Sequence, residues 1–181
     1  MFVNHESEAG VQSGTQAEPY HSIADALAQV GEGGRIYVCN GDLAHDEAVV
    51  LDKSVTLYGG VQCASWRAST SATRWTAGAD EIPLQVTGAP TEARVEGFAI
   101  TSQNATVVGG SSIGVLVWEA TLTLESTVVV AGNGAAGQSQ DQLVRAAQAG
   151  RGRAGGAGGM SGQTTTEGGA GGTNTATCGN R

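Results

Sequence analysis

The hydrophobic positions of this chain predict one short helix followed by a succession of short strands. Between residues 22 and 30, apolar residues recur at the i, i+3, i+4 and i+7 spacing that places them on one helical face. These residues are Ile23, Ala26, Leu27 and Val30. Ser22 and Asp25 have the residue types of a capping box, and glycines follow from residue 31. A helix with one apolar face needs an apolar surface to cover.

After this helix, short segments that are apolar, or that alternate apolar with polar residues, lie between Gly, Asn, Ser and Thr residues, which is typical of β-strands. The segments are 35–39, 55–57, 84–86, 94–100, 114–117 and 121–130. A similar spacing of apolar residues recurs at an offset of about 30 residues, as in stacked coils. The pattern predicts an all-β fold, a right-handed parallel β-helix (solenoid) with an N-terminal capping α-helix. An antiparallel sandwich is the alternative.

The last part of the chain differs in composition from the rest. From residue 132 to residue 181 it consists mainly of Gly, Ala, Thr, Gln and Ser, with hardly a large apolar residue after Val144. Such a low-complexity segment cannot bury enough apolar surface to offset the entropy lost on ordering. We therefore predict two parts: a capped β-helix domain, residues 1–131, and a flexible Gly-rich tail, residues 132–181.

Charge and hydropathy exclude several classes of partner. The net charge of -8 disfavours binding to the phosphates of nucleic acid and to anionic lipid. No run of about 18 apolar residues is present, so no membrane span is expected. The three cysteines, Cys39, Cys63 and Cys178, fit no zinc-binding spacing, and we expect no metal and no cofactor.

Cys39 and Cys63 follow two successive predicted strands, so they lie close together if those strands stack. A disulfide between them and a pair of small buried thiols are both consistent with this placement. Cys178, in the Gly-rich tail, has no evident partner.

Several segments of the first half of the chain resemble a known family. They are Phe2–Asn4, Gly14–Ile23, Ala26–Leu27, Val38–Gly41, Glu47–Leu51 and Leu57–Gly60 with Trp66. Together they are similar to the N-terminal cap and first coils of pectin-lyase-like bacterial surface proteins, and the resemblance covers roughly residues 2–130. It implies a right-handed parallel β-helix and a secreted or cell-surface location, with a leader that is not present in this chain. The Gly-rich tail resembles the glycine-rich insertions of such proteins.

Two groups of residues are candidates for ligand binding. One is a dense polar cluster near the capped end, formed by Asp42, His45, Asp46 and Glu47. The other is Trp118, which follows a strand and is the best candidate for stacking on a sugar ring. The resemblance implies that an enzyme of this fold would carry a carboxylate cluster with an Arg or a His on its central coils. Paired-carboxylate chemistry requires two groups about 5–9.5 Å apart, and nothing in this sequence requires such a pair.

We therefore expect a non-catalytic scaffold or binding module of a secreted or surface β-helix protein, which contacts a polysaccharide or another surface protein. A polysaccharide lyase or glycoside hydrolase of the pectin-lyase-like fold is the alternative. The sequence after residue 130 lacks an apolar stripe comparable to that of the helix, so we also expect self-association through an uncapped C-terminal coil.

Overall fold

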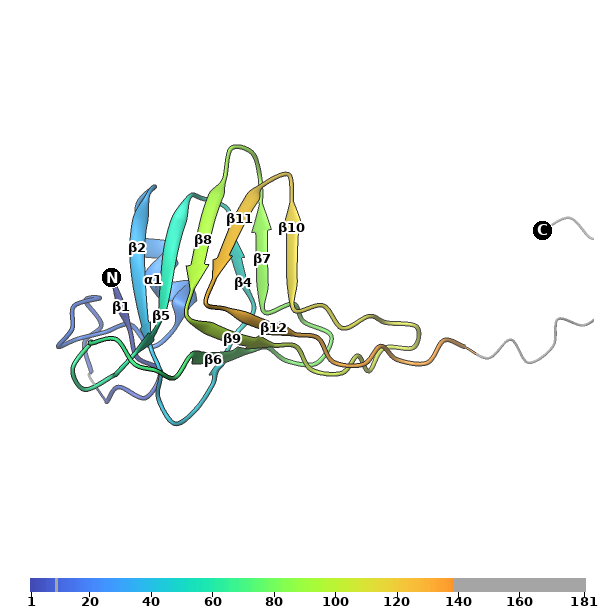
Figure 1. Cartoon of the computed structure of the whole chain (residues 1–181), viewed down its shortest axis with the longest axis horizontal. Helices are drawn as coiled ribbons and strands as arrows, with labels where there is room; N and C mark the ends of the chain where they lie inside the picture. The colour runs from blue at the N-terminus through green and yellow to red at the C-terminus, as the bar shows by residue number, and fades with distance from the viewer. Residues whose placement is uncertain (9, 139–181) are drawn as a thin grey trace, which may run out of the picture. The chain divides into compact units, whose positions relative to one another are not determined.

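The computed structural model describes residues 1–8 and 10–138, and it contains one short helix and many short strands (Figure 1). The prediction of flexibility for residues 139–181, and the question of a partner for Cys178, lie outside the described residues. Residues 132–138 are described, and their backbone hydrogen-bonds to residues 105–110. Ala105 donates to Asn133, and Ala135 donates to Gly110.

The helix α1 spans Ile23–Gln29. The strands follow in chain order: β1 Phe2–Val3, β2 Gly34–Cys39, β3 His45–Asp46, β4 Val49–Leu51, β5 Val55–Val61, β6 Thr73–Thr76, β7 Leu84–Thr87, β8 Glu92–Glu96, β9 Phe98–Thr101, β10 Val115–Trp118, β11 Thr121–Glu125 and β12 Val128–Val130.

The strands form three sheets, and every pairing between these strands is parallel. The first sheet has the order β1-β2-β5-β8-β11, the second β10-β7-β4 and the third β12-β9-β6-β3. The chain visits the three sheets in turn, so that β5, β6 and β7 are followed by β8, β9 and β10 in the same three sheets. The described residues therefore have an all-β fold with parallel sheets, and the antiparallel sandwich is wrong.

The core is formed by side chains that alternate inward along each strand. Ile36, Leu57 and Val95 are register partners on β2, β5 and β8, and all three are fully buried. Trp75 and Ile100 are paired in the same way on β6 and β9. Because pairing is parallel and in register, residues of like character form rows that run across each sheet.

Helix α1 packs against β1, β2 and β4 and buries Ile23, Ala26 and Leu27. Ser22 is its N-cap, and the Ser22 hydroxyl oxygen accepts a hydrogen bond from the amide of Asp25 at 3.0 Å. The Asp25 carboxylate accepts from the Ser22 hydroxyl at 2.6 Å, where a standard capping box would have it accept from the Ser22 amide. The amides of Ile23 and Ala24, in the first turn, donate hydrogen bonds to the side-chain carboxylate of Glu47.

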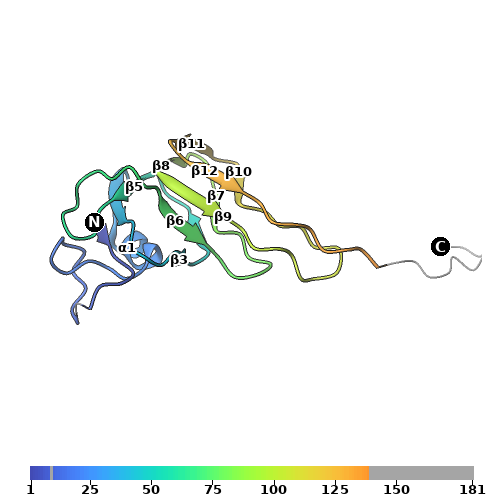
Figure 2. The same ribbon diagram turned by 60° about the horizontal axis from the view of Figure 1, so that its bottom comes forward.

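Long connections follow strands β6 and β9 of the third sheet. The segments after β9 and after β12 run side by side away from the sheets (Figure 2), joined by the backbone hydrogen bonds of residues 105–110 with residues 133–136. Asp80, in the connection after β6, accepts hydrogen bonds from the amides of Thr106 and Val107 at 2.8 and 3.2 Å. Each connection is therefore tied to the next one along the stack.

Candidate functional site

The polar cluster expected at residues 42–47 does not converge on one site. Asp42 and Asp46 are exposed, whereas the His45 side chain is 2% exposed and that of Glu47 is 16% exposed. Residues 45 and 46 form β3, whose alternation turns His45 inward and Asp46 outward. The cluster thus divides between solvent and the interior.

Glu47 binds the start of helix α1. Its two carboxylate oxygens accept hydrogen bonds from the amides of Ile23 and Ala24, at 2.8 and 3.1 Å. These amides have no partner within a helix, and a carboxylate also interacts favourably with the positive end of the helix dipole. Burial nevertheless raises the pKa of Glu47, since desolvation outweighs the two amide hydrogen bonds. Glu47 therefore fixes α1 to the chain that enters β4.

His45, on β3, is buried next to Glu47. Its Nε2 lies 3.3 Å from the carbonyl oxygen of Cys39, and since a carbonyl only accepts, Nε2 carries the proton. Its Nδ1 lies 3.9 Å from Glu47 Oε1 and has no hydrogen-bond partner among residues 1–8 and 10–138. Burial lowers the pKa of His45, which favours the neutral ring. The ring of His5 is 5.7 Å away, centroid to centroid.

Trp118 is separate from this cluster. It ends β10, the edge strand of the second sheet, whereas His45 and Asp46 belong to the third sheet. Its side chain is 64% exposed, and its register neighbour on β7 is Thr87. The structure places no other aromatic ring in contact with it among the described residues.

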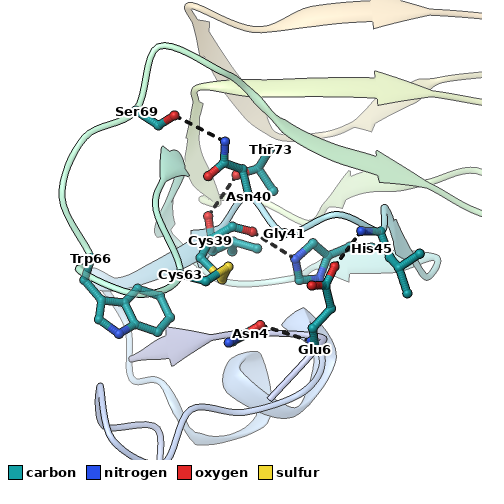
Figure 3. Close-up of a disulfide and its surroundings, with 12 residues drawn as sticks. Asn4, Glu6, Cys39, Asn40, Gly41, His45, Cys63, Trp66, Ser69 and Thr73 are labelled. Atoms are coloured by element: carbon teal, nitrogen blue, oxygen red, sulfur yellow. Dashed lines mark hydrogen bonds between the residues drawn. A yellow bond between two sulfur atoms is a disulfide. The ribbon is translucent and has the colours of Figure 1, made fainter. Parts of the chain in front are cut away.

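A disulfide joins Cys39 at the end of β2 to Cys63 in the loop after β5 (Figure 3). The same loop is held at further points. Ser69 donates its amide to the carbonyl of Gly60 at 2.6 Å, and its hydroxyl accepts from Asn40 Nδ2 at 3.3 Å. Trp66, at the tip of this loop, packs edge-on against the ring of Phe2 at 4.9 Å. The loop from residue 62 to residue 72 is thus fastened to the edge of the first sheet.

An aromatic row on the outer face of the first sheet is the feature that the sequence reasoning missed. Phe2, Tyr37 and Tyr58 are successive register partners on β1, β2 and β5. Their rings stack with centroid distances of 5.3 and 5.1 Å and interplanar angles of 20° and 15°. The next partners in the row are Glu96 and Glu125, so the aromatic row continues as carboxylates.

The signal for this row was present in the sequence. Tyr37 lies between the apolar residues Ile36 and Val38, and Tyr58 follows the apolar Leu57 in a segment with the same alternation. Alternation places each tyrosine on the face opposite the buried positions. Recognising that the two share one row required the register between β2 and β5, which the sequence alone does not supply.

A groove of about 320 Å³ lies beside the tyrosines. The residues that line it include Tyr37, Tyr58, Gly60, Ser69, Glu96 and Ser126. One wall is formed by the disulfide-linked loop, through Ala68 and Ser69, and by Val61 at the end of β5. The groove therefore combines aromatic rings, a carboxylate, serine hydroxyls and bare backbone.

The backbone is exposed here because the corner after the first sheet has little room for side chains. Gly60, Gly97 and Ser126 have φ values of 63°, 79° and 46°. The left-handed residue thus recurs near the end of β5 and directly after β8 and β11. A Cβ atom on Gly97 would lie 2.9 Å from the carbonyl oxygen of Gly59, too close for a side chain. Successive turns therefore pack backbone against backbone at this corner.

Arg94 arranges the carboxylates next to the groove. Its guanidinium hydrogen-bonds the Glu96 carboxylate at 3.1 Å and also the carboxylate of Glu125. The hydrogen bond to Glu96 raises the pKa of Arg94 above its ordinary value. Glu96 and Glu125 are 36% and 45% exposed, so both retain carboxylate surface toward solvent.

Comparisons with protein-family models, with curated proteins and with solved structures found no match, so none of them identifies a pectin-lyase-like domain. Within residues 1–8 and 10–138, no helix has both the length and the hydrophobicity needed to cross a bilayer. The described residues also contain no group of three or more His, Cys, Asp or Glu side chains arranged to hold a metal ion.

Proposed function

We propose that this chain is a non-catalytic scaffold and binding module of a secreted or cell-surface protein, built as a right-handed parallel β-helix. The order in which the chain visits its three sheets supports the β-helix, because β5, β6 and β7 and then β8, β9 and β10 occupy successive levels. Right-handed connection is the strong preference for parallel strands joined by a crossover. The sequence resemblance to the pectin-lyase-like family points to the same architecture.

The way in which the chain uses its carboxylates carries the proposal of a non-catalytic role. Glu47 binds the first turn of α1, Glu32 accepts from the amide of Ser54 at 2.8 Å, and Asp80 accepts from two amides of the following connection. Glu6 accepts from the amide of Leu43 at 2.5 Å. Such carboxylates hold loops in place, and they are already engaged with backbone donors. General acid–base catalysis needs a carboxylate that faces substrate and can exchange a proton with it, whereas Glu96, which lines the groove beside Tyr58, is hydrogen-bonded to the guanidinium of Arg94.

The disulfide supports a location outside the cytosol. Structural disulfides persist in oxidising compartments and are rare where thiol reductants are abundant. The Cys39–Cys63 bond joins residues 24 positions apart and fastens a loop of the groove. Mass spectrometry of the protein, purified with alkylation of free thiols, is expected to find residues 39 and 63 linked.

The test of the non-catalytic role is incubation with polygalacturonate plus calcium, and with neutral polysaccharides, at high protein concentration. We expect no unsaturated product absorbing in the ultraviolet and no increase in reducing ends. The alternative, a lyase or glycoside hydrolase, requires a product that disappears on Asp46→Asn or Glu47→Gln. Such a product would replace the present proposal with the enzymatic one.

A further inference from the structure

We propose that the groove beside Tyr58 binds an uncharged polysaccharide, one pyranose ring lying against the tyrosine and its hydroxyls bonding to Glu96 and the neighbouring serines. This inference rests on the proposed function, a binding module, and it names the site and the class of ligand. It moves the sugar-binding surface away from Trp118 and from residues 42–47, to a different face of the chain.

The aromatic row gives the groove a fixed ring surface. Tyr37 covers one side of Tyr58, at 5.1 Å between centroids and 15° between planes. The other side of Tyr58 faces the next level of the sheet, where its register partner is Glu96. A ring held in this way loses little freedom when a ligand packs on it, and aromatic side chains combine apolar area with a polar tip. The apolar face of a pyranose fits such a surface.

Polar groups converge on the same groove. Glu96 offers carboxylate oxygens, Ser69 and Ser126 offer hydroxyls, and the corner glycines leave backbone unobstructed. A binding site of this kind has an apolar surface with a few placed polar groups that fix orientation. The volume of about 320 Å³ lies at the small end of ligand pockets, which suits a short stretch of sugar rings.

Charge selects an uncharged polymer over an acidic one. Glu96 lines the groove, Glu125 is the next residue in its row, and the chain carries a net charge of -8. Arg94, the cation bonded to Glu96, is also bonded to Glu125. A polyuronate would therefore meet like charge at these two carboxylates, and this repulsion discriminates against it.

The walls of the groove are preorganised. The disulfide holds the loop that supplies Ala68 and Ser69, and the bond from the Ser69 amide to the Gly60 carbonyl closes it against the corner. Fixing a binding surface in advance reduces the entropy lost on binding. Reduction of the disulfide should therefore weaken binding in addition to any effect on stability.

Affinity gel electrophoresis of the full chain tests this proposal. The native gels contain hydroxyethyl cellulose, galactomannan or a soluble β-1,3-glucan as neutral polymers, and polygalacturonate as the acidic one. We expect retardation by at least one neutral polymer and none by polygalacturonate. Tyr58→Ala should weaken the retardation at least about tenfold in apparent affinity, and Glu96→Gln should weaken it severalfold. Tyr58→Phe, which keeps the ring, should retain most of the affinity.

Trp118→Ala is the matched control, since it removes an exposed aromatic residue from another sheet, and it should leave retardation unchanged. Far-ultraviolet circular dichroism checks that each variant is folded. Retardation by no neutral polymer overturns the groove, and so does retardation that survives Tyr58→Ala in a folded variant. Retardation lost only with Trp118→Ala also overturns it but leaves a binding module in place. Bond cleavage in the activity assay, by contrast, would contradict the proposed function and not the groove.

Discussion

Replacing Glu47 by Ala should destabilise the protein by removing the acceptor for the first turn of α1. The Ile23 amide is buried, so without its partner it incurs the cost of an unsatisfied buried donor, about 2 kcal/mol. Ala24 is exposed, and water can replace much of its bond, which leaves a cost of about 0.5–1 kcal/mol. The sum is about 2.5–3 kcal/mol in the free energy of unfolding.

Glu47→Gln separates the role of the hydrogen bonds from that of the charge. Because the pKa of Glu47 is raised in the folded protein, ionisation of its carboxyl group opposes folding. The stability that the protonated carboxyl group contributes is present at low pH and is lost as the pH rises through the folded-state pKa. The neutral Gln resembles the protonated acid and retains an oxygen for the Ile23 amide. We therefore expect Glu47→Gln to remain within about 1 kcal/mol of the parent at neutral pH.

Urea unfolding followed by circular dichroism measures these effects. With a slope of roughly 2 kcal/mol per molar urea, Glu47→Ala should lower the midpoint by about 1.3 M. Asp46→Ala, one residue earlier and exposed, is the control and should change stability by less than about 0.5 kcal/mol. The reasoning fails if Glu47→Ala unfolds at the parent midpoint, or if Asp46→Ala costs as much. A Gln variant as unstable as the Ala variant would show that the charge holds the helix.

Three further predictions concern the core, the buried histidine and the disulfide. Leu57→Asp should lower the free energy of unfolding by about 4 kcal/mol or more, because it buries an unpaired charge between Ile36 and Val95. Thr56→Asp, on the outer face, should lower it by less than about 1 kcal/mol. Equal melting temperatures for the two variants would contradict the inward direction of Leu57. Because burial lowers the pKa of His45, its contribution to stability should be lost as the pH falls below its ordinary value of 6.5. The titratable groups around this position, His5, Glu6 and Glu47, are the same in the parent and in a His45→Gln variant, so their own effects cancel in the comparison. The parent should therefore lose more stability than His45→Gln between about pH 7.5 and about pH 5, and equal losses of stability in the two proteins would refute this. The double variant Cys39→Ser, Cys63→Ser should lose about 3.5 kcal/mol of unfolding free energy, because the disulfide no longer closes a loop of this length in the unfolded chain. An unchanged midpoint of chemical denaturation would show that the disulfide does not constrain the unfolded chain.

The elements that the sequence predicts well are those with a local pattern. The apolar spacing of residues 23–30 and the N-cap type of Ser22 depend only on neighbours along the chain, and the structure has α1 at Ile23–Gln29 with Ser22 as its cap. Strands β5 and β8 have enough alternation to be recognised. Strands β3 and β6 were missed because His45–Asp46 and Thr73–Thr76 are too short and polar for a periodicity to be detected.

The site was harder to predict because it depends on contacts between distant residues. Asp42, His45, Asp46 and Glu47 read as one polar loop, yet the direction of Glu47 is set by amides 23 and 24 residues earlier in the chain. Burial of His45 likewise depends on its position on β3. The groove needed the register of β2, β5 and β8, which brings Tyr37, Tyr58 and Glu96 into one row. No local pattern carries that information.

The three sheets end together on one side of the described chain, at β10, β11 and β12. Helix α1 contacts β1, β2 and β4, at the opposite side of the stack. Leu124, Val128 and Val130 are among the exposed apolar residues of the open side, where the strand edges have no partner strand within residues 1–8 and 10–138. Further strands can therefore be added at the open side alone. A duplicated segment of about 30 residues after β12 would find three parallel strand edges to pair with, and each further copy of the segment would meet equivalent edges. The length of such a molecule would be set by how many times one segment is repeated, with no change to the capped end.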